Sequence, residues 1–353
     1  MKYLFALLML IPFAGAAQLQ VNGRVVNADN SNPIPDASIF LNNTTTGTKA
    51  AADGSFKLYN LRSGQYDLIV TVVGYQTHKQ TITVSNNTTL PVIKMAPKTM
   101  MMNEVVIGGG DPKRARKLRL FKDQFLGRSS FADQCEIANP ETLILKFSND
   151  ETVLSAYTND FLEITNNYLG YKLRYIVNNF VLDRRIMSVA YEGYVSFEEL
   201  EGSAQQKRKW AKNRGSVYYG SPTHFLREIL ANRLDKDYMV RPFCFKSVDE
   251  NKVMKFDTLK VADYVHKTDQ QNIFAVNYPG NLDVFYYPPG IPRQLATMGR
   301  ETGNRGQVGS IDFIDNNIFF DINGTILNPT GAFFKYQWGS TRVAQLLPVD
   351  YWP

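Results

Sequence analysis

Histidine and cysteine are scarce in this sequence, and their scarcity limits the chemistry that it can perform. The 353 residues include three His and two Cys. A catalytic zinc ion needs three protein ligands, usually with two of them close in sequence. The three His are widely scattered and none begins an H-x-x-E or H-E-x-x-H motif, while His224 and Glu228 are spaced to lie one helical turn apart. Because no third ligand can be named, we favour a helix surface pair and predict no metal site and no cofactor.

Motifs of the common catalytic classes are missing as well. The chain has no G-x-S-x-G nucleophile elbow and no G-x-x-x-x-G-K-[ST] phosphate loop, so GGGDPKRARK is not expected to cradle a nucleotide. The carboxylates are scattered along the chain. No catalytic residue is predicted, and an envelope hydrolase that uses an unrecognised carboxylate pair stays open as an alternative.

Long apolar runs are limited to the first residues. In MKYLFALLMLIPFAGAAQ, one lysine precedes an apolar run that ends in small residues, as is typical of a secretory signal peptide. We predict a signal peptide at residues 1–17. No cysteine stands directly after its small residues, and no later segment holds about 20 consecutive apolar residues. We therefore expect a periplasmic protein without a lipid anchor or a transmembrane helix, associated with the outer membrane through a partner.

The two cysteines, Cys135 and Cys244, allow two interpretations. In an exported protein they could form a disulfide bond, which would stabilise the fold by about 4 kcal/mol in the chain-entropy model. They could equally be unpaired buried thiols that pack as small apolar groups.

Aromatic residues and cations, in contrast, are plentiful. The 19 Tyr and 22 Phe favour β-sheets, where flat rings pack on pleated surfaces. A formal charge of +6 permits contact with an acidic partner, although the extra Lys and Arg residues of such a protein more often lie on a solvated surface. No nucleic-acid motif is present, so we expect no nucleic-acid partner.

Residues 18–97 read as a series of short strands. Apolar and polar residues alternate in QVNGRVV and DGSFKLYNL, and Asp53-Gly54 is a strong tight-turn pair. In GQYDLIVTVV, alternation places Tyr66 and Leu68 on one face and Ile69 on the other. About seven such strands separated by turns predict a β-sandwich.

The motifs of this segment resemble the carboxypeptidase-like regulatory domain, a transthyretin-like sandwich. The matching positions are G-x-V at 23–25, Pro35-x-Ala37, Asp53-Gly54-x-Phe56, Leu61-x-x-Gly64-x-Tyr66 and Gly74-Tyr75. In that family the domain stabilises or docks a larger protein and is not the catalytic part. The resemblance therefore implies a fold and not a reaction.

Segment 98–111 joins the sandwich to the rest of the chain. Its residues Glu104, Val105 and Val106 resemble the TonB box of Bacteroidota outer-membrane receptors, which carry the same sandwich. An extended linker or an added edge strand explains so short a motif as well. A plug and a barrel of about 22 strands cannot fit in the residues that follow, so the chain is receptor-like only near its N-terminus.

A basic helix is predicted at the start of 112–353. Asp111-Pro112 predicts its N-cap and first position, Phe121 and Phe125 recur at helical spacing, and Gly127 ends it. The other side of the helix could anchor to anionic lipid headgroups or an acidic partner protein, or be a solvated face. That side carries Lys113, Arg114, Arg116, Lys117, Arg119 and Lys122.

The rest of 112–353 predicts an α+β domain with an antiparallel sheet. Three strand-like stretches over 160–197 predict a meander, two helices follow, and Ser221-Pro222 should begin the second one. The fold class is thus mainly β / α+β, a seven-stranded transthyretin-like sandwich followed by this domain. The whole chain resembles secreted Bacteroidota proteins known only by their carboxypeptidase-like regulatory domain, in stretches such as LEITNNYLGYKLRYIV and LLPVDYWP.

Two aromatic features are weaker candidates. Tyr218, His224 and Arg227 belong to a cluster at a helix start where backbone N–H groups could bind an anion, although capping with core packing is favoured. The three tryptophans could stack on sugar rings, although aromatic residues of β-rich proteins are usually core. They are Trp210, Trp338 and Trp352.

Together these features favour a non-catalytic periplasmic accessory or scaffold protein. It would dock onto an outer-membrane β-barrel protein or complex of the assembly, uptake or secretion machinery. Anionic lipid headgroups and cell-wall glycan are further candidate partners. The alternatives are a module that binds cell-envelope glycan or peptidoglycan, and an uncharacterised envelope hydrolase.

Overall fold

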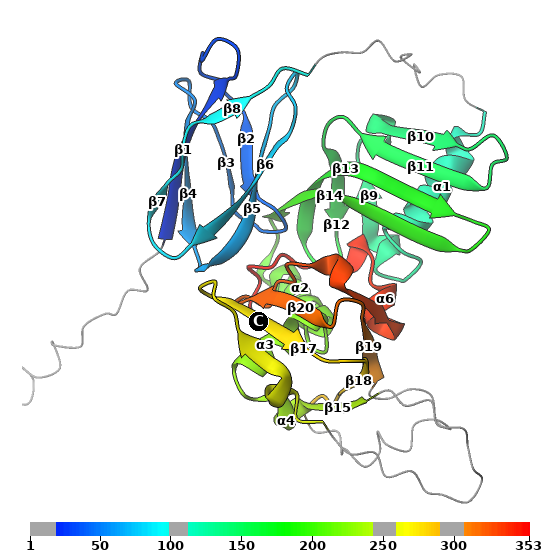
Figure 1. The fold of residues 1–353 in the computed structure, drawn as a ribbon. Helices are drawn as coiled ribbons and strands as arrows, with labels where there is room; N and C mark the ends of the chain where they lie inside the picture. Colours follow the sequence, from blue (N-terminus) through cyan, green and yellow to red (C-terminus); the bar gives the residue numbers. More distant parts are fainter. Residues whose placement is uncertain (1–18, 99–111, 243–258, 290–306) are drawn as a thin grey trace, which may run out of the picture.

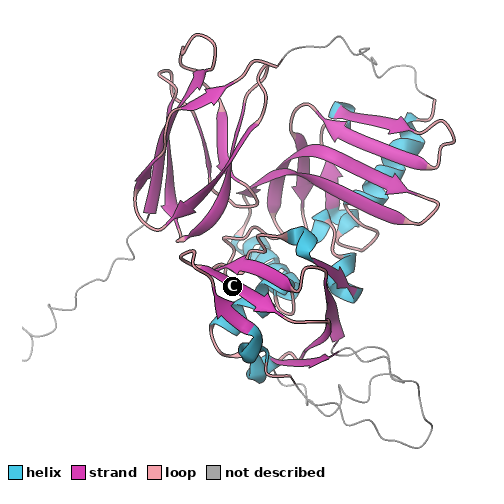
Figure 2. Ribbon diagram, viewed as in Figure 1, coloured by secondary structure: helices cyan, strands magenta, loops and turns pink. Residues whose placement is uncertain are grey.

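The computed structural model describes residues 19–98, 112–242, 259–289 and 307–353. Figure 1 shows an N-terminal sandwich, a large twisted sheet with a helix on one face, and a C-terminal lobe of small sheets and helices. Strands outnumber helices (Figure 2), which confirms the predicted mainly β / α+β class. No helix in the described ranges is long and apolar enough to cross a membrane. The predicted signal peptide, the Glu104-Val105-Val106 segment and Cys244 lie outside these ranges.

The sandwich consists of two packed sheets. In the first, β1 lies between β4 and β7 and also pairs with β8, and in the second the order is β3-β2-β5-β6. Eight strands occupy residues 19–95 where about seven were expected, because β7 has two residues and shows no alternation in the sequence. The strands are β1 (Leu19–Asn27), β2 (Ser38–Leu41), β3 (Gly47–Lys49), β4 (Ser55–Leu61), β5 (Gly64–Thr71), β6 (His78–Val84), β7 (Thr88–Thr89) and β8 (Ile93–Met95).

Alternation along β4 and β5 correctly predicts their core residues. Phe56 and Leu58 are buried, as are Tyr66 and Leu68. The tight turn before β4 requires glycine. Gly54 has φ +79°, and a Cβ atom there would lie 2.3 Å from a backbone oxygen of β1.

A six-stranded antiparallel sheet forms the second unit, in the order β10-β11-β13-β12-β9 with β14 on the other side of β13. The meander predicted over 160–197 is confirmed, because β12, β13 and β14 pair successively in antiparallel register. The elements are α1 (Arg114–Phe125), η2 (Ala132–Gln134), β9 (Cys135–Ile137), η3 (Pro140–Thr142), β10 (Leu143–Phe147), β11 (Val153–Thr158), β12 (Leu162–Asn166), β13 (Tyr171–Asp183) and β14 (Ser188–Glu199).

Helix α1 packs on this sheet through Phe121 and Phe125, both fully buried. Their rings lie 4.9 and 6.4 Å from the ring of Phe180 on β13. The prediction that Asp111-Pro112 opens the helix was wrong. Helix α1 begins at Arg114, with Lys113 as an N-cap that makes no side-chain cap. The first turn is held by contacts to the sheet instead of by a capping side chain.

The C-terminal lobe has its own apolar core between two antiparallel sheets and several helices. The sheets have the orders β15-β18-β19-β21 and β16-β17-β20. Ser221 caps α3 and Pro222 is its first residue, as predicted. The elements are α2 (Ala204–Tyr218), α3 (Pro222–Leu230), α4 (Leu234–Asp237), β15 (Tyr238–Pro242), η4 (Val261–Tyr264), β16 (Val265–Lys267), β17 (Ile273–Asn277), β18 (Asn281–Tyr286), β19 (Gln307–Phe313), β20 (Asn317–Asp321), η5 (Pro329–Gly331), β21 (Ala332–Lys335), α6 (Tyr336–Ser340) and η6 (Val343–Gln345).

The sandwich is docked onto the six-stranded sheet through side chains that face away from its own core. Phe40 and Ile69 form a separate apolar cluster with Phe161 and Ile176. The rings of Phe40 and Phe161 lie 5.9 Å apart. Apolar burial therefore holds the two units together.

Hydrogen bonds extend this contact along the edge of β14. The Asn43 N–H donates to the Val195 carbonyl oxygen at 2.7 Å, and the Phe197 N–H donates to the Thr44 carbonyl oxygen at 2.9 Å. The loop after β2 thus covers part of an otherwise unpaired strand edge.

Candidate functional site

The cations of the basic helix do not form one continuous solvated face. Arg114 and Lys117 donate hydrogen bonds to backbone carbonyl oxygens at or beside β10. Lys113 and Arg116 both pair with Glu151, in the loop between β10 and β11. These four cations attach α1 to the sheet. The side chains of the other two, Arg119 and Lys122, make no hydrogen bond or ion pair within the described part of the chain.

The tip of the β13–β14 hairpin lies beside the same loop. Arg184 donates to the Glu151 carbonyl oxygen at 3.1 Å. Ile186 and Met187, at the tip, are 73% and 74% exposed. We call this surface the basic end; it comprises Lys113, Arg116, Arg184, Arg185, Ile186 and Met187.

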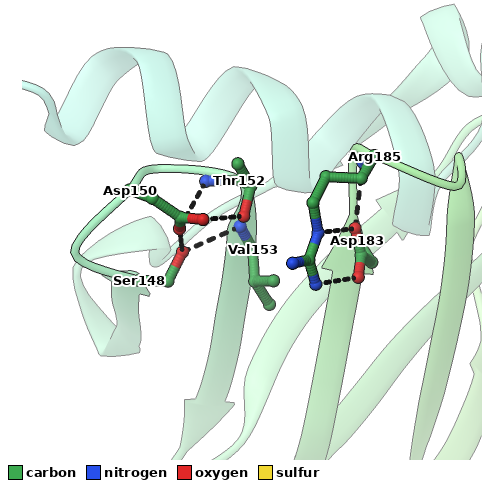
Figure 3. A network of polar contacts seen from close by, with 6 residues as sticks. All are labelled: Ser148, Asp150, Thr152, Val153, Asp183 and Arg185. Atoms are coloured by element: carbon green, nitrogen blue, oxygen red, sulfur yellow. Dashed lines mark hydrogen bonds and ion pairs between the residues drawn. The ribbon is translucent and has the colours of Figure 1, made fainter.

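Polar contacts within each of the two loops of the basic end connect its side chains and backbone (Figure 3). Asp150 accepts hydrogen bonds from the Ser148 hydroxyl at 2.5 Å and the Thr152 hydroxyl at 2.8 Å. These bonds, led by that from Ser148, lower the pKa of Asp150 to about 2. Asp183 accepts from the backbone N–H and the guanidinium of Arg185. Loops that are already ordered lose less conformational entropy when a partner binds.

His224 is buried among tyrosine rings and is not arranged as a metal ligand. The Tyr238 hydroxyl lies 2.7 Å from its Nδ1, and burial lowers the pKa of His224. Its Nε2 is 3.9 Å from Glu228, which is paired with Arg233 at 2.7 Å. Within the described residues, no three His, Cys, Asp or Glu side chains gather closely enough to hold a metal ion.

Arg227 binds the C-terminal tail of the protein itself. Its guanidinium donates to the carbonyl oxygens of Val349 at 2.7 Å and Tyr351 at 2.9 Å, and to a carbonyl oxygen of the lobe at 2.7 Å. The same guanidinium lies 3.9 Å from the ring centroid of Trp352. Arg227 is only 4% exposed. Arg227, a candidate anion ligand from the sequence, therefore already donates its hydrogen bonds to backbone carbonyl oxygens.

The tail also reaches the sandwich. Asp350 accepts hydrogen bonds from the Thr45 N–H at 3.0 Å and from its hydroxyl at 2.6 Å. Val349 packs against the sandwich core, and Arg62 lies over the Trp352 ring at 4.8 Å. The last residues thus connect the sandwich to the C-terminal lobe.

The three tryptophans differ in exposure. Trp210 and Trp338 are buried, whereas Trp352 is 43% exposed. The Trp352 ring is stacked with Arg227 and Arg62. Trp352 alone of the three reaches the surface, and its ring already has partners.

Cys135 begins β9 and is half-buried. Its thiol donates to the Phe131 carbonyl oxygen at 3.5 Å, and burial raises its pKa to about 12. Its proposed partner Cys244 lies outside the described residues, so the disulfide and the two unpaired thiols both stay predictions.

A polar groove lies where the two sheets of the sandwich part. Strand β3 pairs with β2 in one sheet, and β4 pairs with β1 in the other. Away from the turn that joins β3 to β4, an open groove of about 500 Å³ separates them. Its walls carry Thr45, Thr46, Thr48, Lys57, Tyr59, Asn60, Arg62 and Asp350, and the buried side chains of Leu41, Leu61 and Tyr66 also line it.

Sequence reasoning missed both the groove and the hairpin tip. The signal for the groove is Tyr59-Asn60, because two polar residues in succession interrupt the alternation of FKLYNL and indicate a bulge. The signal for the tip is Ile186-Met187, an apolar pair beside Arg185 at a place where turns are usually polar.

Comparison with protein-family models identifies the family of the N-terminal sandwich. Residues 21–107 match the family model of the CarboxypepD_reg-like domain. The N-terminal part of this chain is a CarboxypepD_reg-like domain. The expected resemblance is thereby confirmed for these residues.

This chain spans only a small part of the length of the curated relatives that it matches. The human BOS complex subunit NOMO3 is 35% identical over 89 residues, which are 25% of this chain and 6% of that protein. Among solved structures, a DUF3823 family protein from Bacteroides ovatus is 11% identical with a TM-score of 0.20, covering 52% of this chain and 82% of that one. The 5-hydroxyisourate hydrolase of Klebsiella pneumoniae is 15% identical with a TM-score of 0.19, covering 23% and 91%.

Proposed function

We propose that this protein is a non-catalytic accessory or scaffold protein, exported to the periplasm, which docks onto an outer-membrane barrel complex through the basic end. The observation that carries the proposal is the Ile186-Met187 pair. Two apolar side chains that are about three-quarters exposed lie on a hairpin tip flanked by cations. An apolar centre with a polar rim is typical of protein–protein interfaces.

The charges of the basic end favour a protein partner over a lipid surface. Lys113 and Arg116 share Glu151, and Arg185 pairs with Asp183. Because carboxylates lie beside three of its four cations, the attraction of the basic end to an anionic membrane is reduced. A partner protein can instead match the alternating charges and bury the apolar tip.

The attachment of the sandwich supports a scaffold role. The cluster of Phe40 and Ile69 with Phe161, together with the tail that joins Arg227 to the sandwich, links the CarboxypepD_reg-like domain to the rest of the chain. The basic end and the sandwich therefore sit on one connected framework, which can hold two surfaces at a set spacing.

The test is affinity purification of the tagged protein from mildly solubilised envelopes of its own host, followed by mass spectrometry. We expect a stoichiometric barrel protein with the native chain, and its loss from the double variant Ile186→Ser/Met187→Ser. The matched control is Val73→Ser/Val92→Ser, which changes two apolar side chains of the sandwich that are 85% and 52% exposed. The control should retain the barrel.

Two results would contradict the proposal. If the native chain is recovered without a barrel protein, the docking function is wrong. If the hairpin variant retains the barrel at native stoichiometry, the basic end is not the docking surface.

A further inference from the structure

The groove between β3 and β4 has the size and lining of a ligand site and shares no residue with the basic end. Its volume of about 500 Å³ falls within the roughly 300–1,000 Å³ of small-molecule sites. Apolar side chains that also belong to the sandwich core, such as Leu41 and Leu61, line it together with hydroxyl, amide and cationic groups. Such a lining suits a ligand with apolar faces and polar edges.

A β-bulge presents two adjacent side chains of β4 beside the groove. Leu58 pairs with Val21, and Leu61 pairs with Leu19, so two residues of β4 lie opposite one of β1. The two residues are Tyr59 and Asn60, and both are exposed. Asn60 has φ +61°, in the left-handed region that few non-glycine residues adopt. Bulges that re-aim side chains and strained backbones are both frequent at functional sites.

Two cations and one carboxylate line the groove. Lys57 and Arg62 are exposed on β4 and the residue after it, on either side of Tyr59. The carboxylate that lines the groove, Asp350, accepts hydrogen bonds from the N–H and hydroxyl of Thr45. Asp350 thus already has hydrogen-bond partners within the protein, whereas Lys57 has no carboxylate partner within the described residues.

We propose that this groove binds an acidic oligosaccharide. One sugar ring packs on the 55% exposed ring of Tyr59. The ring hydroxyls exchange hydrogen bonds with Asn60 and with the threonine hydroxyls of the facing wall. A carboxylate or phosphate group on the sugar is bound by Lys57 and Arg62 through charge-assisted hydrogen bonds.

The test uses the mature chain on an array of neutral and acidic oligosaccharides, with isothermal titration of the acidic sugars that bind. We expect binding to carboxylated or phosphorylated oligosaccharides and not to neutral ones of equal length, and weaker binding as salt increases. Tyr59→Ala should weaken binding by roughly tenfold or more. Lys57→Gln should reduce the preference for acidic over neutral sugars.

Matched variants separate ligand contacts from general effects. Tyr157→Ala removes an exposed strand tyrosine of β11, and Lys94→Gln removes an exposed lysine of β8, both outside the groove. Both should bind like the native chain. Tri-glutamate serves as a probe that has charge without a sugar ring, and it should bind far more weakly.

Three results would overturn the inference. They are an array without any bound acidic oligosaccharide, equal affinity for tri-glutamate and the acidic sugar, and unchanged affinity in Tyr59→Ala. If the array separates carboxylated from phosphorylated sugars, it identifies which anionic group the groove accepts. None of these results depends on whether a barrel protein is recovered with the chain.

Discussion

Cations hold two regions of this protein together, and the two regions differ in how many cations they use and in how deeply these are buried. Helix α1 and its N-cap Lys113 carry six cations, of which four attach the helix to the adjoining sheet at the protein surface. The second region is the tail junction, where Arg227 contacts Val349, Tyr351 and Trp352. Arg227 is its one central cation, and it is buried and holds the last residues against the lobe. Charge density along the sequence therefore does not show where a cation matters for the fold. A buried arginine whose hydrogen bonds reach distant backbone carbonyls stabilises more than several solvated ones.

The largest expected effect comes from breaking the tail junction. Arg227→Met leaves the carbonyl oxygens of Val349 and Tyr351 without their donor and removes the guanidinium stacked on Trp352. We expect the free energy of unfolding to fall by about 4 kcal/mol, measured by urea denaturation. The matched variant on α1, Arg119→Met, should change it by less than about 0.5 kcal/mol. Equal losses in the two variants would remove the contrast between the regions.

The second variant tests which side chains hold α1 on the sheet. Phe121→Ala leaves a cavity beside Phe125 and Phe180 and should lower the free energy of unfolding by about 3 kcal/mol. Lys122→Ala, one residue further along the helix, should change it by less than about 0.5 kcal/mol. A large loss in the lysine variant would show that the cations carry more of the helix attachment than the structure indicates.

The smallest effect is a pH dependence of stability that arises from His224, three residues before Arg227 on α3. Burial lowers the pKa of His224 from the value of 6.5 that applies in an unfolded chain. Below pH 6.5 the unfolded chain therefore takes up a proton that the folded protein resists, and stability falls as the pH falls towards the lowered pKa. Glu228 and Asp237 oppose the shift, while Arg227 and Arg233 add to it.

The measurement is the urea midpoint between pH 7.5 and 5. Its decrease on acidification should be smaller in His224→Gln than in the native chain. His266→Gln, at an exposed position of β16, should keep the native slope. An identical slope in all three proteins would show that His224 is not the group responsible.

Local sequence patterns predicted much of the fold. Alternation and the Asp53-Gly54 turn predicted the sandwich, and Ser221-Pro222 predicted the start of α3, because caps, turns and strand faces depend on residues close together in the chain. The predicted start of α1 was wrong for a related reason. Contacts of Arg114 with the sheet hold its first turn, and no local pattern reports them.

The candidate sites were predicted less well. The six cations could be counted in the sequence, but their carbonyl and Glu151 partners could not. The groove arises from the separation of β3 and β4, which pair in different sheets. The basic end arises from loops brought together by the pairing of β11 with β13.

By itself, the sequence determined the strands, the turns and the inward face of the sandwich, since these follow from a side-chain period of two and from backbone preferences. Ile69 shows what the side-chain period of two does not determine. Alternation places Ile69 on the face of β5 opposite to Tyr66 and Leu68, away from the sandwich core, yet Ile69 is fully buried. Only the tertiary structure brought Phe161 and Ile176 onto that face and the tail onto Arg227. The physical reason is that burial of an outward-facing side chain depends on which distant surface docks against it, and no local pattern encodes that surface.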